Sequence, residues 1–237
     1  ELKAKDIPAD IIQVNDKRTG IVDISINDQG EPDYTIHENV AWDFIHFEEL
    51  LQQKIREADI ICFGTLAQRS SVSRATIQKI IESANTETLI AYDINLRQHY
   101  YTEEIIKISL QQCNVLKLNE DELPVLCKLL KTTGKTELER INHLMDEFCL
   151  KLVAYTKGGE GSFLITPSEK SYLSTPRVKV RDTVGAGDAF TAAMIVCFAK
   201  GFPLKKVHEK AVEIAAFVCT RDGAMPEYIN SNLLNIH

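Results

Sequence analysis

The 237-residue chain carries a net charge of −7, which argues against a nucleic-acid surface because such a surface needs clustered Lys and Arg. Hydrophobic residues make up 44% and charged residues 26%, the balance of a globular protein with one large domain, or with a domain and a small appendage. The longest apolar run, about 189–199, is too short to cross a bilayer and the charged start lacks a signal peptide, so we expect a cytoplasmic protein with no membrane partner.

The first predicted elements are two strands near the start of the chain. Apolar and polar residues alternate from Val22 to Asn27, which is the period of a strand with one wet face. Asp28-Gln29-Gly30 supplies a turn, and Tyr34-Thr35-Ile36 can return as the partner strand. We therefore treat residues 1–41 as a pair of strands with its connections.

From Trp42 onward, short apolar runs typical of parallel strands alternate with stretches typical of helices. This order predicts an α/β fold in which a mainly parallel central sheet carries helices on both faces, and we treat 42–237 as its core. The predicted strands are 58–64, 89–93, 115–118 and 152–156, and the predicted helices are 72–84, 103–113, 120–131 and 135–148.

Three polar motifs follow directly after predicted strands. They are Asp93-x-Asn95-x-Arg97, Asn119-x-x-Glu122 and Gly158-Gly159-x-Gly161. Because ligands gather at the carboxyl ends of strands in such folds, we expect these motifs to share one rim of the sheet. Asp93, Asn95 and Arg97 alternate, so their side chains can share one side of an extended segment.

The stretch from Asp182 to Phe190 is the most informative part of the chain. A turn of small residues, Gly185-Ala186-Gly187, precedes an acid, Asp188, and then an apolar run that predicts a buried helix. The positive end of such a helix holds anions on its N–H groups, and glycines let a phosphate approach closely. Asp188 would repel a phosphate that is merely bound. It suits a reaction in which a carboxylate takes a proton from an attacking hydroxyl while the N–H groups hold a transferred phosphoryl group. The alternative is a helix cap beside tightly packed glycines.

This stretch closely resembles the C-terminal signature of the ribokinase-like (PfkB-type) carbohydrate kinases. The resemblance extends from about Thr19 to Pro226 in the order that the family uses. It is carried by the blocks 63–66, 93–97, 117–123, 156–162 and 219–226, and it is strongest to bacterial fructokinases at 41–43, 66–70 and 223–226.

The resemblance implies a ribokinase-like three-layer α/β/α fold with a small β lid (1–41) and a kinase core (42–237). It also implies ATP-dependent phosphorylation of a sugar hydroxyl, with fructose as the expected substrate. Ribose, 2-keto-3-deoxygluconate or a nucleoside are alternative substrates, and a non-catalytic nucleotide- or sugar-binding fragment is the alternative from another class.

The family pattern assigns roles to individual residues. Asp188 becomes the general base, with Gly185, Ala186 and Gly187 as the anion hole. Asn119 and Glu122 would help to hold Mg²⁺ through water, although an acidic first helical turn has the same composition. Asp182 would bind a monovalent cation such as K⁺, or simply cap a turn. The sugar side would take Asp93, Asn95, Arg97 and Asp188, with an Asp93–Arg97 ion pair as the alternative, and the ATP side would take Asn119, Glu122, Thr156, Gly158, Gly159, Gly161, Gly223 and Ala224.

Two expectations concern the lid. The family normally begins with a strand, a sugar-facing lid segment and a Gly-Gly-x-x-x-Asn block, and nothing before Thr19 resembles that block. We therefore expect the chain to enter the family's fold part-way, as a fragment or with an N-terminal piece outside this sequence. Because unpaired strands seek partners, we also expect a homodimer through the lid strands.

Overall fold

The computed structural model describes residues 7–26 and 32–227. The chain forms two compact units that interleave along the sequence. The first contains residues 1–58, 65–86 and 97–101, and the second contains 59–64, 87–96 and 102–237. The predicted turn at Asp28-Gln29-Gly30 lies outside the described residues.

The first unit contains the predicted pair of strands. Strand β1 (Val22–Ile26) pairs antiparallel with β2 (Pro32–Ile36), with Val22 opposite Ile36. Val22 and Ile24 are 50% and 63% exposed, so the alternating pattern does not bury these side chains. The unit also holds the short 3₁₀ helices η2 (Ala41–Asp43) and η3 (Leu66–Gln68) and the helices α1 (Glu49–Arg56) and α2 (Ser71–Glu82).

A buried arginine ties the first unit together. The Arg69 guanidinium donates from Nε to Asp43 Oδ1 at 2.8 Å and from Nη2 to Asp43 Oδ2 at 2.9 Å, and both side chains are 5% exposed. Its planar group also lies 4.0 Å from the centre of the Trp42 ring and 4.7 Å from that of Tyr100. Two of the fructokinase-like blocks, 41–43 and 66–70, therefore meet at one ion pair.

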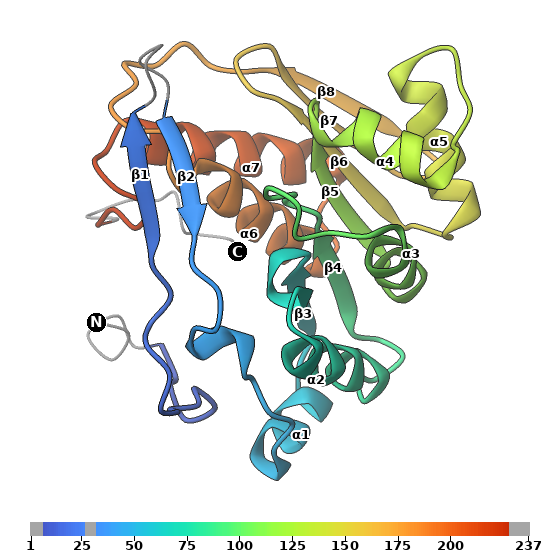
Figure 1. Cartoon of the computed structure of the whole chain (residues 1–237). Coiled ribbons are helices and arrows are strands. Elements are labelled where there is room, and N and C mark those ends of the chain that lie inside the picture. Colours follow the sequence, from blue (N-terminus) through green and yellow to red (C-terminus); the bar gives the residue numbers. More distant parts are fainter. Residues whose placement is uncertain (1–6, 27–31, 228–237) are drawn as a thin grey trace. The chain divides into compact units, whose positions relative to one another are not determined.

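The second unit is built on a six-stranded sheet with the strands in sequence order, β3 to β8 (Figure 1). Strands β3 to β6 are parallel, whereas β7 and β8 continue the sheet antiparallel. The strands are β3 (Ile60–Gly64), β4 (Leu89–Asp93), β5 (Val115–Asn119), β6 (Leu152–Lys157), β7 (Gly161–Ile165) and β8 (Lys170–Ser174), and the helices are α3 (Glu103–Gln112), α4 (Glu122–Leu130), α5 (Glu137–Glu147), α6 (Ala186–Ala199) and α7 (Leu204–Cys219).

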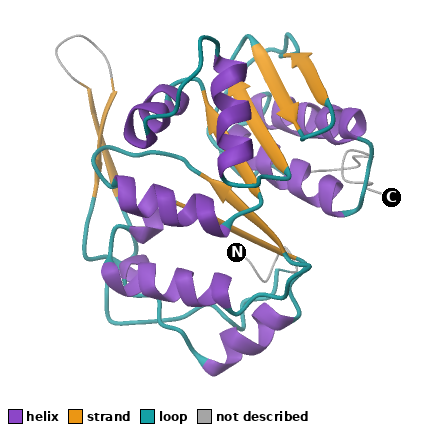
Figure 2. Cartoon of the chain, turned by 90° about the vertical axis from the view of Figure 1, so that its right-hand side faces the viewer, coloured by secondary structure: helices purple, strands orange, loops and turns teal. Residues whose placement is uncertain are grey.

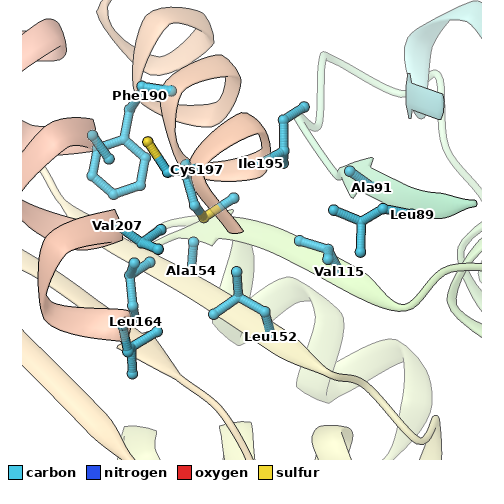
Figure 3. Packing of buried hydrophobic residues seen from close by; sticks show 14 of the residues in the cluster. Leu89, Ala91, Val115, Leu152, Ala154, Leu164, Phe190, Ile195, Cys197 and Val207 are labelled. Carbon is cyan, nitrogen blue, oxygen red and sulfur yellow. The ribbon is translucent and has the colours of Figure 1, made fainter. Parts of the chain in front are cut away.

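Helices cover both faces of this sheet (Figure 2), as the sequence predicts. Right-handed crossovers between strands in consecutive order carry α3, α4 and α5 to one face. The other face packs against α6 and α7, and Figure 3 shows this core. Its labelled members are Leu89, Ala91, Val115, Leu152, Ala154 and Leu164 from the strands, Phe190, Ile195 and Cys197 from α6, and Val207 from α7.

The two-residue period of a strand now fixes which side chains face α6. Ala91 and Val115 belong to the core beneath α6 and α7, so Asp93 and Lys117, two positions further along β4 and β5, point to the same face. Both lie near the carboxyl ends of their strands. None of the helices within residues 7–26 and 32–227 is long and apolar enough to cross a membrane.

Candidate active site

A buried ion pair marks the carboxyl rim of the sheet. Asp93 and Lys117 are direct neighbours in the pairing of β4 with β5. Lys117 Nζ lies 3.1 Å from Asp93 Oδ1, and the two side chains are 9% and 13% exposed. A charged pair at this depth needs further hydrogen-bond partners, because the desolvation penalty of the two groups can exceed the free energy of their mutual attraction.

Helix α6 supplies the next part of the site. Gly185 is its N-cap residue, with a left-handed φ of 80°, and a Cβ built on it would lie 2.7 Å from the Ala224 carbonyl oxygen. Ala186 donates its N–H to the Thr183 carbonyl oxygen at 3.2 Å. The next N–H groups, of Gly187 and Asp188, lie in the first helical turn, where a helix has no acceptor of its own to offer. They point outward at the positive end of the helix dipole and can hold an anion.

The ion pair and the helix are linked through Thr191. Its Oγ1 lies 2.9 Å from Asp93 Oδ2 and 3.0 Å from the Gly187 carbonyl oxygen. A Cβ built on Gly187 would lie 3.8 Å from Lys117 Nζ, which places the ammonium group against the first turn of α6. Asp93, Lys117 and the α6 N-terminus therefore form one continuous cluster.

Asp188 belongs to the same surroundings. It is exposed in that first turn, as a group that receives a proton from a bound molecule must be. Burial raises the pKa of the Cys62 thiol to about 11, and the charges of Asp93 and Asp188 contribute to this rise. Both carboxylates thus act on the thiol of Cys62 in β3, which stays protonated at neutral pH.

Asn119 and Glu122 hold the ends of two strands together. Asn119 Oδ1 accepts N–H bonds from Asp121 at 3.0 Å and Glu122 at 2.9 Å. Glu122 is 4% exposed, and its Oε2 accepts from the Asn119 N–H at 2.8 Å while Oε1 accepts from the Leu96 N–H at 3.0 Å. Burial raises the pKa of Glu122, while Lys117 and the two N–H groups oppose this shift. Each carboxylate oxygen keeps a lone pair for a water molecule.

The three glycines at the turn between β6 and β7 stand in different surroundings. Gly158 has a φ of 43°, and its carbonyl oxygen accepts a bond from Thr175 Oγ1 at 2.6 Å. A Cβ on Gly161 would lie 2.5 Å from the Leu173 carbonyl oxygen, so the close approach of β8 requires this glycine. Around Gly159 the space is open. Thr156 Oγ1 lies 3.5 Å from the Leu118 carbonyl oxygen.

An apolar groove of about 560 Å³ lies beyond this turn, between the end of β8 and α7. It has the size of a small-molecule site, and acidic side chains stand at its α7 wall. Its lining includes Leu173, Pro176, Val178, Val212, Ala216 and Phe217, with Glu209 and Glu213 as the acidic residues.

Asp182 closes the loop before α6. Its Oδ1 accepts the Val184 N–H at 2.9 Å and its Oδ2 accepts the Gly223 N–H at 3.1 Å. These two bonds lower the pKa of Asp182, the bond from Val184 most. Together with the approach of Gly185 to Ala224, they bring the segment 223–224 to the start of α6.

The expectation that Asp93, Asn95 and Arg97 share one side of an extended segment needs a correction. Strand β4 ends at Asp93, and Asn95 has a positive φ of 39°, so the segment is not extended as far as Arg97. Side chains do not alternate there, because a left-handed residue reverses the direction of the chain. Arg97 belongs to the first unit, within 97–101.

Lys117 and Thr191 were not among the residues predicted from the sequence. The apolar pattern places Lys117 within a predicted strand, and a lysine inside a strand that is otherwise buried on both faces is itself a sign of a functional residue. Within residues 7–26 and 32–227, no cluster of three His, Cys, Asp or Glu side chains is arranged to bind a metal directly.

Comparison with known proteins identifies the family of this chain. Residues 1–230 match the model of the pfkB family of carbohydrate kinases. The fructokinase of Vibrio alginolyticus is 26% identical over 227 residues, which are 91% of this chain and 72% of that protein. The fructokinase of Escherichia coli is 27% identical over 222 residues, 88% of this chain and 70% of that protein.

Solved structures share the fold. An uncharacterized sugar kinase of Pyrococcus horikoshii in complex with ATP has a TM-score of 0.76 and 27% identity, over 94% of this chain and 72% of that one. A fructokinase of Xylella fastidiosa with bound ATP has a TM-score of 0.84 and 20% identity, over 99% and 78%. An Escherichia coli structure described as a ribokinase II, with ATP and Mg²⁺, has a TM-score of 0.74 and 19% identity, over 94% and 71%.

Proposed function

This chain belongs to the PfkB family of carbohydrate kinases, and from that premise we propose that it transfers the γ-phosphoryl group of ATP to a hydroxyl of fructose. The predicted family and the predicted ribokinase-like α/β fold are confirmed, and the chain is a sugar kinase. The choice of fructose is supported by fructokinases among the relatives and by the blocks 41–43, 66–70 and 223–226. In this proposal residues 1–41 serve as the sugar lid and 42–237 as the kinase core.

The observation that carries the proposal is the exposed carboxylate of Asp188 in the first turn of α6, beside outward N–H groups. We assign Asp188 as the base that takes the proton of the sugar hydroxyl. The N–H groups of Gly187 and Asp188 then hold the charge of the phosphoryl group in flight, in the turn opened by Gly185 and Ala186. Phosphoryl transfer depends on such positioning and charge neutralisation more than on a strong base.

The nucleotide side of the proposal rests on the apolar groove beside α7. An aromatic base fits a groove of this size and polarity. The turns at Thr156, Gly158, Gly159 and Gly161 and at Gly223 and Ala224 lie toward the phosphates in this assignment. We propose Asp93, Asn95 and Arg97 for the sugar and phosphate side.

Mg²⁺ fits this site through water. Mg²⁺ keeps several water ligands and binds few carboxylates directly, and Glu122 and Asn119 offer oxygens whose direct bonds are already to backbone N–H groups. The ion would neutralise phosphate charge when bound. For Asp182 we propose K⁺ as a second cation. Both of its carboxylate oxygens accept backbone N–H bonds, which a carboxylate that only caps a turn would also do. The reaction rate in K⁺ and in tetramethylammonium distinguishes the two roles, and equal rates would remove the assignment of K⁺.

The test is ADP release with Mg-ATP and K⁺ across fructose, ribose, 2-keto-3-deoxygluconate and adenosine. We expect the highest kcat/KM with fructose, and we expect Asp188→Asn to abolish turnover while the protein stays folded. A higher kcat/KM with another acceptor would replace the substrate. No release with any acceptor, from folded protein that binds ATP, would leave a binding module.

Two further parts of the proposal concern the oligomeric state and the cellular compartment of the enzyme. Val22, Ile24 and Tyr34 are exposed apolar residues on β1 and β2, which supports a homodimer through these strands. Sedimentation at several protein concentrations tests it, with Val22→Glu as the disrupting variant. We place the reaction in the cytoplasm, where ATP is available.

A further inference from the structure

We propose that Lys117 binds the transferred phosphoryl group and that Asp93 and Thr191 position it for this task. This inference rests on the proposed function, because it requires ATP at the α6 N-terminus. It adds a buried lysine to a reaction for which the residues proposed from the sequence supply N–H groups, a metal site and Arg97. Lys117 is one of the buried charged residues of the second unit, at 7% exposure.

The contact with Asp93 does not use up the donors of Lys117. An ammonium group has three N–H donors. Nζ lies 3.1 Å from Asp93 Oδ1, yet within the described residues that oxygen has no hydrogen bond of acceptable geometry. The pair is therefore held by charge, and the N–H vectors of Lys117 are available to another acceptor.

The acceptor that suits Lys117 best is an anion at the start of α6. A Cβ on Gly187 would already be in van der Waals contact with Nζ, at 3.8 Å. Because residue 187 is a glycine, the space between Nζ and the first turn stays open. An oxygen in that space meets the ammonium group on one side and the N–H groups of Gly187 and Asp188 on the other.

The surroundings hold Lys117 in this place. Asp93 Oδ1 attracts Nζ, and Asp93 Oδ2 is fixed by Thr191, which lies one turn after Gly187 on the same helix. The helix that carries the anion site therefore also fixes the counter-ion of the lysine. Glu122 adds a second carboxylate whose charge interacts with Lys117. These acids attract the ammonium group without filling all of its donor positions.

The chemical role follows from the charge. When the sugar oxygen forms its bond to phosphorus, the bond between the γ-phosphorus and the bridging oxygen breaks, and its electron pair leaves with ADP. The hydroxyl proton goes to Asp188. Lys117 gives up no proton. Its fixed positive charge balances the negative charge on the phosphoryl oxygens during the transfer.

The experiment compares Lys117→Met with Lys107→Met, a matched change of an exposed lysine on α3. Calorimetry gives the affinities for ATP and ADP without sugar, and steady-state assays give kcat. We expect Lys117→Met to lose about 10²-fold or more in kcat, as removal of one transition-state donor does. Its affinity for ATP should fall about tenfold more than its affinity for ADP, because ADP lacks the γ-phosphate. Lys107→Met should match the wild type in both.

A double variant keeps the test valid if Lys117→Met folds poorly with Asp93 left unpaired. Lys117→Met/Asp93→Asn removes both charges, so it should recover stability but not kcat or the ATP-over-ADP preference. Thr191→Val should lower kcat about tenfold while the KM for sugar stays unchanged, which a purely structural loss would not do selectively. Equal losses of ATP and ADP affinity, or a kcat within threefold of the wild type, would overturn the inference. A wild type that binds ATP without phosphorylating any sugar would overturn the proposed function instead, and the two affinities would still decide the role of Lys117.

Discussion

The carbonyl oxygen of Ala224 occupies the space that a side chain on Gly185 would need. A Cβ at Gly185 would lie 2.7 Å from that oxygen and 2.8 Å from two further atoms of Ala224. Since Gly185 also has a left-handed φ of 80°, two separate constraints meet at the N-cap of α6. The segment after α7 is thereby held against the helix that carries Asp188.

Gly185→Ala should destabilise the protein and abolish activity. The left-handed conformation costs a non-glycine residue about 1–2 kcal/mol, and the contact with backbone adds to this cost because a carbonyl cannot rotate away. Gly201→Ala is the matched control, because Gly201 has a φ of 73° and a Cβ placed on it would have no atom within 4 Å. Urea unfolding should show a larger loss for Gly185→Ala; equal losses would mean that Ala224 yields freely.

Gly187→Ala should have the opposite effect on stability. Gly187 is helical and its new Cβ would meet Lys117 Nζ at an ordinary 3.8 Å, so alanine should stabilise the helix by up to about 1 kcal/mol. The same methyl group fills the space in which we place the phosphoryl oxygen. We expect a raised Tm together with a kcat at least tenfold lower. Full activity in this variant would argue against that placement.

His208 should make the folded state less stable in acid. Its side chain is fully buried between Ser162 Oγ and Ser171 Oγ, each 2.8 Å from a ring nitrogen. Burial lowers the pKa of His208 from 6.5 to about 4. Between pH 6.5 and about 4, His208 therefore binds a proton in the unfolded chain but stays neutral in the folded state. Stability is fully present above pH 6.5 and falls toward pH 4, by at most about 1.4 kcal/mol per pH unit.

Chemical unfolding at several pH values between 4 and 7 measures this slope. His208→Gln should lower stability at pH 7 but flatten the slope, whereas His143→Gln, which changes a half-exposed side chain, should leave it unchanged. The opposite contribution of Glu122, whose pKa is raised, is common to all three proteins and cancels in the comparison. An unaltered slope in His208→Gln would contradict the assignment.

Arg69→Met should destabilise the first unit by about 3–5 kcal/mol, since it leaves the carboxylate of Asp43 buried without its counter-ion. Arg69→Met/Asp43→Asn should recover part of that loss because no buried charge remains. Limited proteolysis within 41–58 and 65–70 reports on this unit directly. Equal protease resistance of the wild type and Arg69→Met would show that the pair contributes little.

Sequence alone locates the four parallel strands, β3 to β6, and the helices α2 to α5. Apolar runs give β4 and β5 closely, and the predicted helix 103–113 matches α3, which is capped by Thr102 Oγ1 accepting the Ile105 N–H. The sequence pattern does not predict strands β7 and β8. Gly161 opens the first with a conformation that strands rarely use, and β8 alternates between half-buried and exposed side chains.

The candidate site could be predicted only as far as local pattern reaches. Local pattern identifies the segment around Asp188 and the block Asn119–Glu122, because the functional residues of each are close together in sequence. The link from Thr191 to Asp93 joins residues 98 positions apart, and the approach of Lys117 to Gly187 depends on how β5 lies beneath α6. Such contacts come from packing, which no local spacing encodes.

Helix α6 is apolar on nearly every side, and behind its first turn Phe190, Met194 and Cys197 are embedded in the core under the sheet. The turn that carries Asp188 is thus the exposed first turn of a helix that is otherwise mostly buried. Heat should consequently inactivate the enzyme and unfold the sheet in a single cooperative transition, because this turn cannot unfold locally while the rest of α6 stays packed.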